Sequence, residues 1–121
     1  MSDQGLSQSL TFIKGERIQT VHLEENNLYF SMSNGASFRI FDSASYCCEK
    51  RWMHTDDDLS YYSGAVLLRA EVRDGPTKYV GVCLSEEQFL VVTTDKGSFT
   101  VVNYNEHNGS YAGFRLEIRR N

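Results

Sequence analysis

The C-terminal segment, residues 111–119, combines arginine and aromatic side chains in a pattern that could bind a nucleotide. A period of two places an apolar set on one face, namely Ala112, Phe114, Leu116 and Ile118, and a second set on the other, namely Tyr111, Gly113, Arg115, Glu117 and Arg119. Arg115 and Arg119 are about 13 Å apart at the rise of a strand. Guanidinium groups bind phosphate oxygens, and aromatic rings stack on bases. This pattern is typical of a nucleotide site, and also of an ordinary solvent face of a sheet.

Amide and imidazole groups lie just before this segment. Asn103, Asn105 and His107 alternate onto one face of the preceding strand. Gly97 suits the left-handed position of a three-residue hairpin loop. We predict a meander of three strands, at 89–94, 98–104 and 111–119. Such a meander would set the three polar side chains beside the two arginines.

The strongest hairpin signal lies earlier in the chain, at Asn34–Gly35. Apolar and polar residues alternate on both sides of this dipeptide, which is the preferred sequence of a two-residue turn. Strands are expected at 27–33 and 36–42, and further strands at 17–23 and 65–73. Thr55 and Asp58 resemble a capping box and Gly64 a C-terminal cap, so the sequence predicts one short helix between them.

The fold class expected from these elements is α+β and β-rich, with small antiparallel sheets built of hairpins and one short helix. The length of 121 residues indicates one ligand-binding domain over 11–121, preceded by a flexible N-terminus at 1–10. No apolar run approaches the roughly 18 residues of a membrane helix, and no signal-like segment opens the chain. A cytoplasmic protein that binds no membrane is expected.

Charge and cysteine usage exclude further classes. A formal net charge of −4 argues against binding duplex nucleic acid, because that affinity comes mainly from many phosphate contacts. Three cysteines, two of them adjacent at Cys47 and Cys48, do not form a secreted disulfide framework. Reduced thiols are expected, the adjacent pair chiefly as small buried side chains.

Metal binding and nucleophilic catalysis find little support. No cysteine or histidine pair has the spacing typical of a metal site. The acidic run Asp56–Asp58 offers hard oxygen ligands but lacks the spacing of a calcium loop, so it is interpreted as a solvated helix start. Phosphate-binding loops and nucleophile elbows are also missing from the sequence. We expect no metal and no cofactor.

Over roughly residues 15 to 119 the chain resembles the phage anti-Thoeris sponge family. The resemblance rests on Tyr46-Cys47-Cys48-Glu49, on the acidic segment leading into Leu59–Leu68, on Phe99–Val102 and on Asn103–Phe114 with its Asn-Gly-x-Tyr-x-Gly sequence. Members are small β-rich phage proteins that sequester immune signalling nucleotides. The resemblance implies binding of a cyclic ADP-ribose isomer, and of cyclic oligonucleotides in some members, by a dimer or hexamer in the cytoplasm of an infected bacterial host.

The resemblance also suggests site residues by their order along the chain. The family's stacking aromatic and paired arginines fit Phe89, Arg115 and Arg119, with Asn103 or a neighbouring residue as a polar contact. Together with the groups around the last turn, the expected ligand-binding set is Phe89, Asn103, His107, Asn108, Tyr111, Arg115 and Arg119. Candidates for a second pocket between subunits are Arg17, Arg39 and Arg51.

The expected function is therefore non-catalytic sequestration of such a nucleotide. Amides, aromatic rings and guanidinium groups hold anions well but activate water poorly. One alternative is an enzyme that cleaves the nucleotide, with His107 as general base and Glu106 or Glu49 in support. Another is a non-enzymatic module that binds a protein through an exposed sheet edge.

Overall fold

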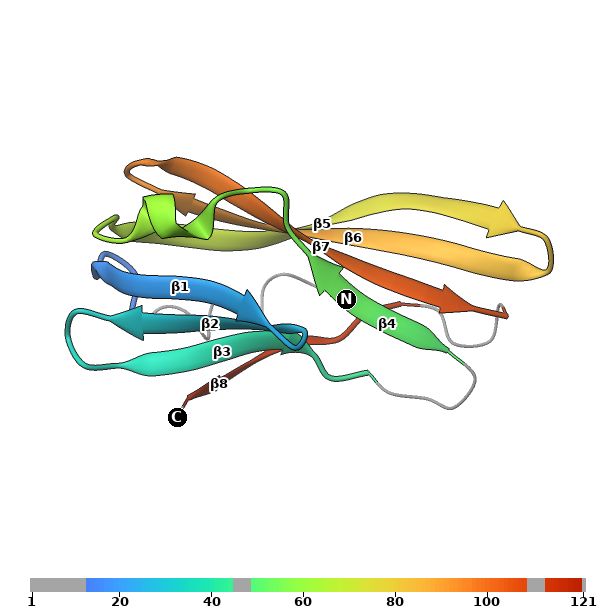
Figure 1. The fold of residues 1–121 in the computed structure, drawn as a ribbon, viewed down its shortest axis with the longest axis horizontal. Helices are drawn as coiled ribbons and strands as arrows, with labels where there is room; N and C mark the ends of the chain where they lie inside the picture. Colours follow the sequence, from blue (N-terminus) through green and yellow to red (C-terminus); the bar gives the residue numbers. More distant parts are fainter. Residues whose placement is uncertain (1–12, 45–48, 109–112, 121) are drawn as a thin grey trace.

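In the described part of the chain, eight strands form two antiparallel sheets that face each other (Figure 1). The computed structural model describes residues 13–44, 49–108 and 113–120, so the predicted flexible segment 1–10 lies outside the described residues. One sheet has the order β1-β2-β3-β8 and the other β4-β7-β6-β5. The elements are β1 (Ile18–Glu24), β2 (Asn27–Met32), β3 (Ser37–Asp42), β4 (Lys50–His54), the 3-10 turn η1 (Leu59–Tyr62), β5 (Leu67–Val80), β6 (Cys83–Thr94), β7 (Gly97–His107) and β8 (Leu116–Arg120). The predicted β-rich antiparallel architecture is confirmed.

The first sheet is built from two tight hairpins. Glu25 and Asn26 form the β1–β2 turn with φ of 50° and 63°, as a two-residue turn of the favoured handedness requires. The predicted hairpin between β2 and β3 is confirmed, but its turn has three residues, 33–35, because the Met32 N–H donates to Ala36 O; Gly35 supplies the positive φ of 92°. The Asn26 side chain also accepts a hydrogen bond from the Met53 N–H at 3.0 Å, which ties this sheet to β4.

The second sheet contains the three longest strands. β6 and β7 pair along their whole length, as expected from the turn that ends at Gly97. β5 is longer than predicted and continues through Gly75 and Pro76, where its register with β6 shifts. An edge strand with a bulge tolerates a proline because the missing N–H breaks no ladder bond there. β4, which pairs with β7 from Lys50 to His54, was not predicted.

The predicted meander of the last three strands is wrong. β8 pairs with β3 in the first sheet, with Ile118 opposite Ile40, and does not pair with β7. Its predicted facing is correct, since Leu116 is buried and Ile118 packs against the core. β8 pairs with the edge of β3, and from there its apolar side chains reach the space between the sheets. Burial of this apolar face of β8 stabilises its position in the first sheet.

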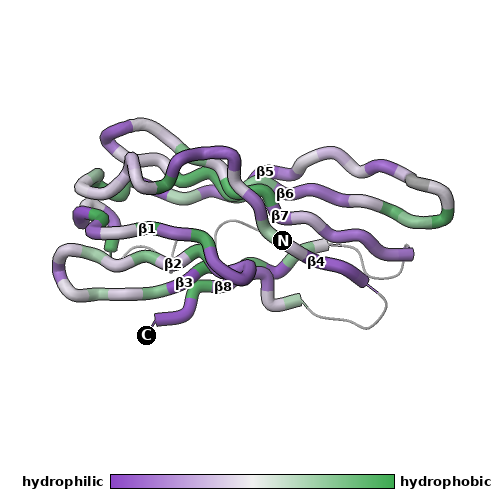
Figure 2. Tube along the Cα trace, viewed as in Figure 1, coloured by the Kyte–Doolittle hydropathy of each residue, from purple (hydrophilic) through white to green (hydrophobic). Residues whose placement is uncertain are grey.

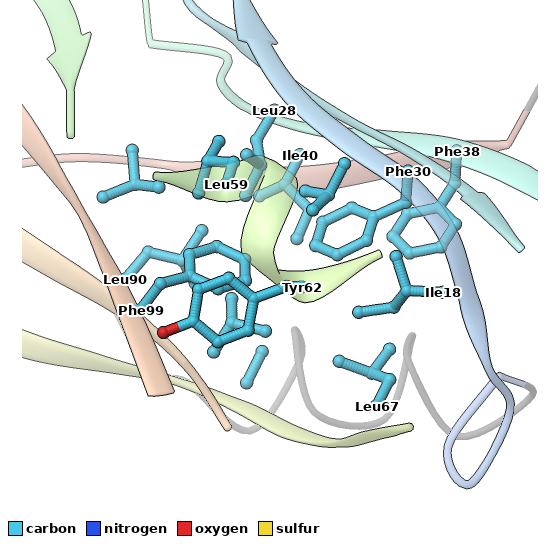
Figure 3. Close-up of a cluster of buried hydrophobic side chains, with 14 of the residues drawn as sticks. Ile18, Leu28, Phe30, Phe38, Ile40, Leu59, Tyr62, Leu67, Leu90 and Phe99 are labelled. Carbon is cyan, nitrogen blue, oxygen red and sulfur yellow. The ribbon is translucent and has the colours of Figure 1, made fainter. Parts of the chain in front are cut away.

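The hydrophobic core fills the space between the two sheets (Figure 3). Phe30 and Phe38 stack at 4.7 Å between ring centroids in the first sheet, and Leu90 and Phe99 face them from the second. Tyr62 from η1 packs on Phe99 and donates a hydrogen bond to Ser98 O at 2.9 Å. Figure 2 shows the apolar residues gathered in this layer, and a second apolar region at the tip of the β5–β6 hairpin.

The predicted helix between Thr55 and Gly64 is reduced to the four residues of η1. Asp58, not Thr55, caps it by accepting a hydrogen bond from the Ser60 N–H. Thr55 instead donates to Thr100 O at 2.7 Å, and the Asp57 carboxylate accepts from the Thr100 N–H at 2.8 Å. These bonds hold the start of the segment against β7 and leave too few residues for an α-helix.

Candidate functional site

The outer face of the first sheet carries one continuous row of aromatic and cationic side chains. His22 lies opposite Tyr29, Tyr29 opposite Arg39, and Arg39 opposite Arg119, one residue from each of the four strands. Neighbouring residues on these strands, such as Leu28 and Ile40, point the other way into the core. Two tight turns align His22, Tyr29 and Arg39, and the pairing of β8 with β3 adds Arg119 from the other end of the sequence.

Arg39 and Arg119 form a pair of adjacent guanidinium groups on this face. Both lie near the Phe41 ring, with guanidinium carbons at 4.6 Å and 5.2 Å from its centroid. Arg39 also donates a hydrogen bond to the amide oxygen of Asn27 at 2.9 Å. Like charges placed directly across two strands repel each other, which destabilises the empty site and favours a bound anion.

Within the described part of the chain, no ion pair compensates the charge of this arginine pair. Among the described residues, arginine ion pairs involve Arg51, Arg69 and Arg73, and neither member of the pair on the first sheet. Glu117 on β8 lies opposite Phe41, between Arg115 and Arg119 in the sequence. Among the described residues it forms no ion pair that would compete with a ligand. The pair can therefore accept the oxygens of a phosphate group.

Two stacked rings continue the row. The His22 and Tyr29 rings are 5.0 Å apart at an angle of 18°. The His22 side chain is 55% exposed, and its Nε2 lies 3.7 Å from a Glu24 oxygen. We call His22, Tyr29, Arg39, Phe41 and Arg119 the aromatic-cationic face. It offers stacking surface at one end and positive charge at the other.

Several predicted ligand residues lie elsewhere. Asn103 and His107 are buried on the inner face of β7, and Phe89 lies on the outer face of the second sheet. Asn108 is exposed at the end of β7, and Tyr111 lies outside the described residues. The predicted set therefore does not converge on one surface, because Phe89 lies on the opposite face of the second sheet from Asn103 and His107, and β8 joins the other sheet.

The remaining predicted arginines have different surroundings. Arg115 is exposed just before β8, and its backbone N–H donates to an Asp42 oxygen at 3.0 Å. Arg17 donates to the carbonyl of Gly64 and so joins the start of β1 to the segment after η1. Of the three second-pocket candidates, Arg39 belongs to the aromatic-cationic face and Arg51 is enclosed in the protein.

Arg51 forms a buried ion triad with two carboxylates. Its Nη1 lies 2.8 Å from Asp42 Oδ2 and its Nε 2.7 Å from Glu49 Oε1, and Nη1 also donates to Gly113 O at 2.8 Å. Burial opposes the charge of the guanidinium, but the hydrogen bonds to Glu49 and Asp42 prevail and raise the pKa of Arg51 above its usual value. Two neighbouring carboxylates leave this guanidinium no net attraction for an anion. A cavity of about 120 Å³ adjoins it, lined by Asn26, Asp42, Arg51, Trp52 and Met53.

A second buried group adjoins the triad through Gly113. His107 Nε2 lies 2.6 Å from Glu86 Oε1, and the same oxygen accepts from Asn105 Nδ2 at 3.3 Å and from the Gly113 N–H at 3.1 Å. Gly113 thus contacts Arg51 with its carbonyl and Glu86 with its N–H. These contacts connect β4, β6 and β7 to the segment before β8, which is a structural role. The engaged, buried imidazole is poorly placed to take a proton from an external ligand.

The acidic run does not gather its carboxylates into one site. Asp56 lies 2.7 Å from His54 Nε2, Asp57 accepts from the Thr100 N–H of β7, and Asp58 accepts from the Ser60 N–H of η1. Within residues 13–44, 49–108 and 113–120, no group of three metal-ligating side chains occurs. The run therefore serves the local turn, in agreement with its interpretation as the start of a helical element.

His22, Tyr29 and Phe41 were missed by sequence reasoning. A signal for Tyr29 was present in the alternation around Asn34–Gly35, because placing Phe30 and Phe38 on the same buried face puts Tyr29 opposite Arg39. The meeting of Arg39 with Arg119 had no local signal, since it depends on the pairing of β3 with β8.

Comparison with known proteins places the chain in a family. No curated protein and no solved structure gives a significant match. No helix within the described residues is both long and apolar enough to cross a membrane. A family model described as a domain of unknown function, DUF7448, matches residues 12–116. Because this match spans most of the 121 residues, the chain belongs to the DUF7448 family.

Proposed function

We propose that this protein binds a cyclic ADP-ribose-like signalling nucleotide on its aromatic-cationic face and sequesters it without cleaving it. The observation that carries the proposal is the arginine pair, Arg39 and Arg119, which lies beside aromatic rings with no ion pair among the described residues. In this proposal the protein acts as a phage-type immune evasion protein in the cytoplasm of an infected bacterial host. Cyclic oligonucleotides share the same phosphate and base chemistry and are candidate ligands as well.

The chemistry of the face favours holding a phosphate over reacting with it. Guanidinium groups supply forks of N–H donors that match phosphate oxygens, and they carry no proton that leaves near neutral pH. Aromatic rings add stacking energy that is equal in the ground state and the transition state. Tight binding of this kind does not accelerate cleavage.

The proposed binding site includes a second copy of the chain. The face is one side of a four-stranded sheet, whereas good ligand sites enclose most of the ligand surface. An open sheet face covers a nucleotide on one side only. We therefore propose a dimer or a hexamer in which the partner covers the other side of the ligand.

Calorimetric titration with cyclic ADP-ribose and with ADP-ribose tests the site. Charge-assisted hydrogen bonds to a phosphate contribute about 1.5–3 kcal/mol, so Arg39→Ala and Arg119→Ala should each weaken binding at least tenfold. Arg69→Ala is the matched control, because this exposed arginine lies on the second sheet. Unchanged affinity in both variants of the pair, with unchanged thermal unfolding, would refute the proposed site.

Recovery of the ligand separates sequestration from cleavage. Ligand mixed with a stoichiometric amount of protein should disappear from solution and return chemically unchanged after heat denaturation. Mass spectrometry identifies the released compound. A hydrolysed product whose yield grows with time, and which is lost in His107→Ala, would favour the enzyme instead.

A further inference from the structure

We propose that the stacked rings of His22 and Tyr29 form a base-binding subsite, so that the face selects nucleotides with at least two phosphates. This inference rests on the proposed function, because it assumes that the arginine pair holds phosphate. It assigns ligand contacts to two residues at the end of the sheet opposite to β8. It also sets the size of the ligand that can engage both ends.

The geometry of the ring pair leaves one stacking surface open. One side of the His22 ring faces Tyr29 at 5.0 Å, and β1 is the outermost strand of the sheet. The His22 side chain is about half exposed. An adenine-sized ring can therefore extend the stack beyond His22, where no further strand among residues 13–44, 49–108 and 113–120 follows.

Strand spacing fixes the separation between the two ends. Neighbouring strands lie about 4.8 Å apart, so the row from His22 to Arg119 across four strands spans about 14 Å. The distance from His22 to Arg39 is two strand spacings, about 10 Å. A base stacked on His22 thus needs a ribose and more than one phosphate to bring an anionic oxygen to the arginine pair. A mononucleotide can occupy one end at a time.

Polar groups along the row fit the same ligand. Asn27, on β2 beside Tyr29, holds the Arg39 guanidinium by a hydrogen bond, which fixes the position of the nearer cation. Phe41 contacts both guanidinium groups and keeps them on the same side of the sheet. The phosphate end is therefore preorganised at the distance that the strand spacing sets, which reduces the cost of binding.

The experiment compares ADP-ribose, AMP and inorganic pyrophosphate by calorimetry on the full chain. We expect ADP-ribose to bind at least tenfold more tightly than AMP or pyrophosphate. His22→Ala and Tyr29→Ala should each weaken ADP-ribose binding about tenfold, from the loss of one stacking contact, and leave pyrophosphate binding unchanged. Tyr29→Phe keeps the ring and should keep the affinity. Arg39→Ala should weaken binding of both compounds.

The outcomes distinguish the two proposals. If Arg39→Ala weakens ADP-ribose binding but His22→Ala and Tyr29→Ala do not, the base subsite is wrong and the phosphate site stands. Equal affinity for AMP and ADP-ribose would likewise overturn the base subsite. If the parent protein binds neither ADP-ribose nor pyrophosphate, both proposals fail. Because the His22 side chain lies on the surface, His22→Ala tests the subsite without disturbing the core.

Discussion

Removal of Arg51 alone should be among the most damaging single changes in this protein. The side chains of Arg51, Asp42 and Glu49 are 11%, 9% and 3% exposed, so Arg51→Met leaves two negative charges buried without their cation. Breaking a buried ion pair by removing one partner costs about 3–5 kcal/mol. A small domain has about 5–15 kcal/mol of stability in all, so the variant should unfold at a much lower urea concentration.

A charge-free version of the triad provides the decisive comparison. Asp42→Asn, Glu49→Gln and Arg51→Met together remove all three charges, and the new amide at position 42 would keep the oxygen that accepts the Arg115 N–H. Replacing a whole buried ion cluster by hydrophobic residues of similar volume is often neutral or stabilising by about 1–4 kcal/mol, and the neutral amides likewise leave no buried carboxylate without its cation. The triple variant should therefore be more stable than Arg51→Met alone. Arg73→Met is the matched control, because its ion pair with Glu71 at 2.6 Å is on the surface and should contribute about 0–1 kcal/mol.

The pH dependence of Arg51→Met has a defined sign. In the folded variant the two buried carboxylates gain from protonation, so the folded state binds protons more readily than the unfolded state at mildly acidic pH. The deficit relative to the parent should therefore shrink as pH falls from about 7 to about 5. In the parent, the raised pKa of Arg51 affects stability only at strongly alkaline pH. The reasoning is refuted if Arg51→Met unfolds within about 1 kcal/mol of the parent, or if the triple variant is no better than the single one.

Three further substitutions test contacts outside the aromatic-cationic face. Gly75→Ala would bring a Cβ to 2.8 Å from Glu87 O and 2.9 Å from the Phe89 ring. It should therefore destabilise the protein by about 1–3 kcal/mol in urea unfolding. An unchanged urea midpoint would contradict this contact. Asn26→Ala removes the acceptor of the Met53 N–H and places alanine at positive φ, so thermal unfolding should show a loss of about 1–2 kcal/mol. Burial, followed by the charge of Asp57, raises the pKa of Tyr62, so the parent should lose stability as pH rises above about 10. This loss should be smaller in Tyr62→Phe. An equal change of unfolding free energy with pH in both proteins would argue against the prediction.

Local sequence signals determined the hairpins and the facing of their side chains. The Asn34–Gly35 sequence predicted the hairpin, and the alternation around it set the register of β2 on β3, and therefore the position of Tyr29 beside Arg39. The turn at Gly97 did the same for β6 and β7. These features depend on residues a few positions apart, so turn chemistry and a period of two are enough to predict them.

Capping signals were less informative, because competing tertiary bonds replaced them. Thr55 has the sequence of a helix cap, but its hydroxyl and the Asp57 carboxylate bond to Thr100 on β7. The helix that the local pattern favoured therefore became a single 3-10 turn. Contacts with a residue more than forty positions away are outside the reach of a local pattern.

The candidate site itself was decided by the tertiary structure. The period of two in residues 115–119 correctly put Arg119 on an outward face, but it contains no information on which strand lies beside it. Pairing with β7 was the nearer choice along the chain, and it would have set Arg119 on the second sheet, away from Arg39 and Phe41. Pairing with β3 instead buries Leu116 and Ile118 in the core between the sheets, and it sets Arg119 against Arg39 and Phe41. A strand's own residues specify its two faces, whereas its neighbour is selected by the apolar surface that the whole sheet can bury.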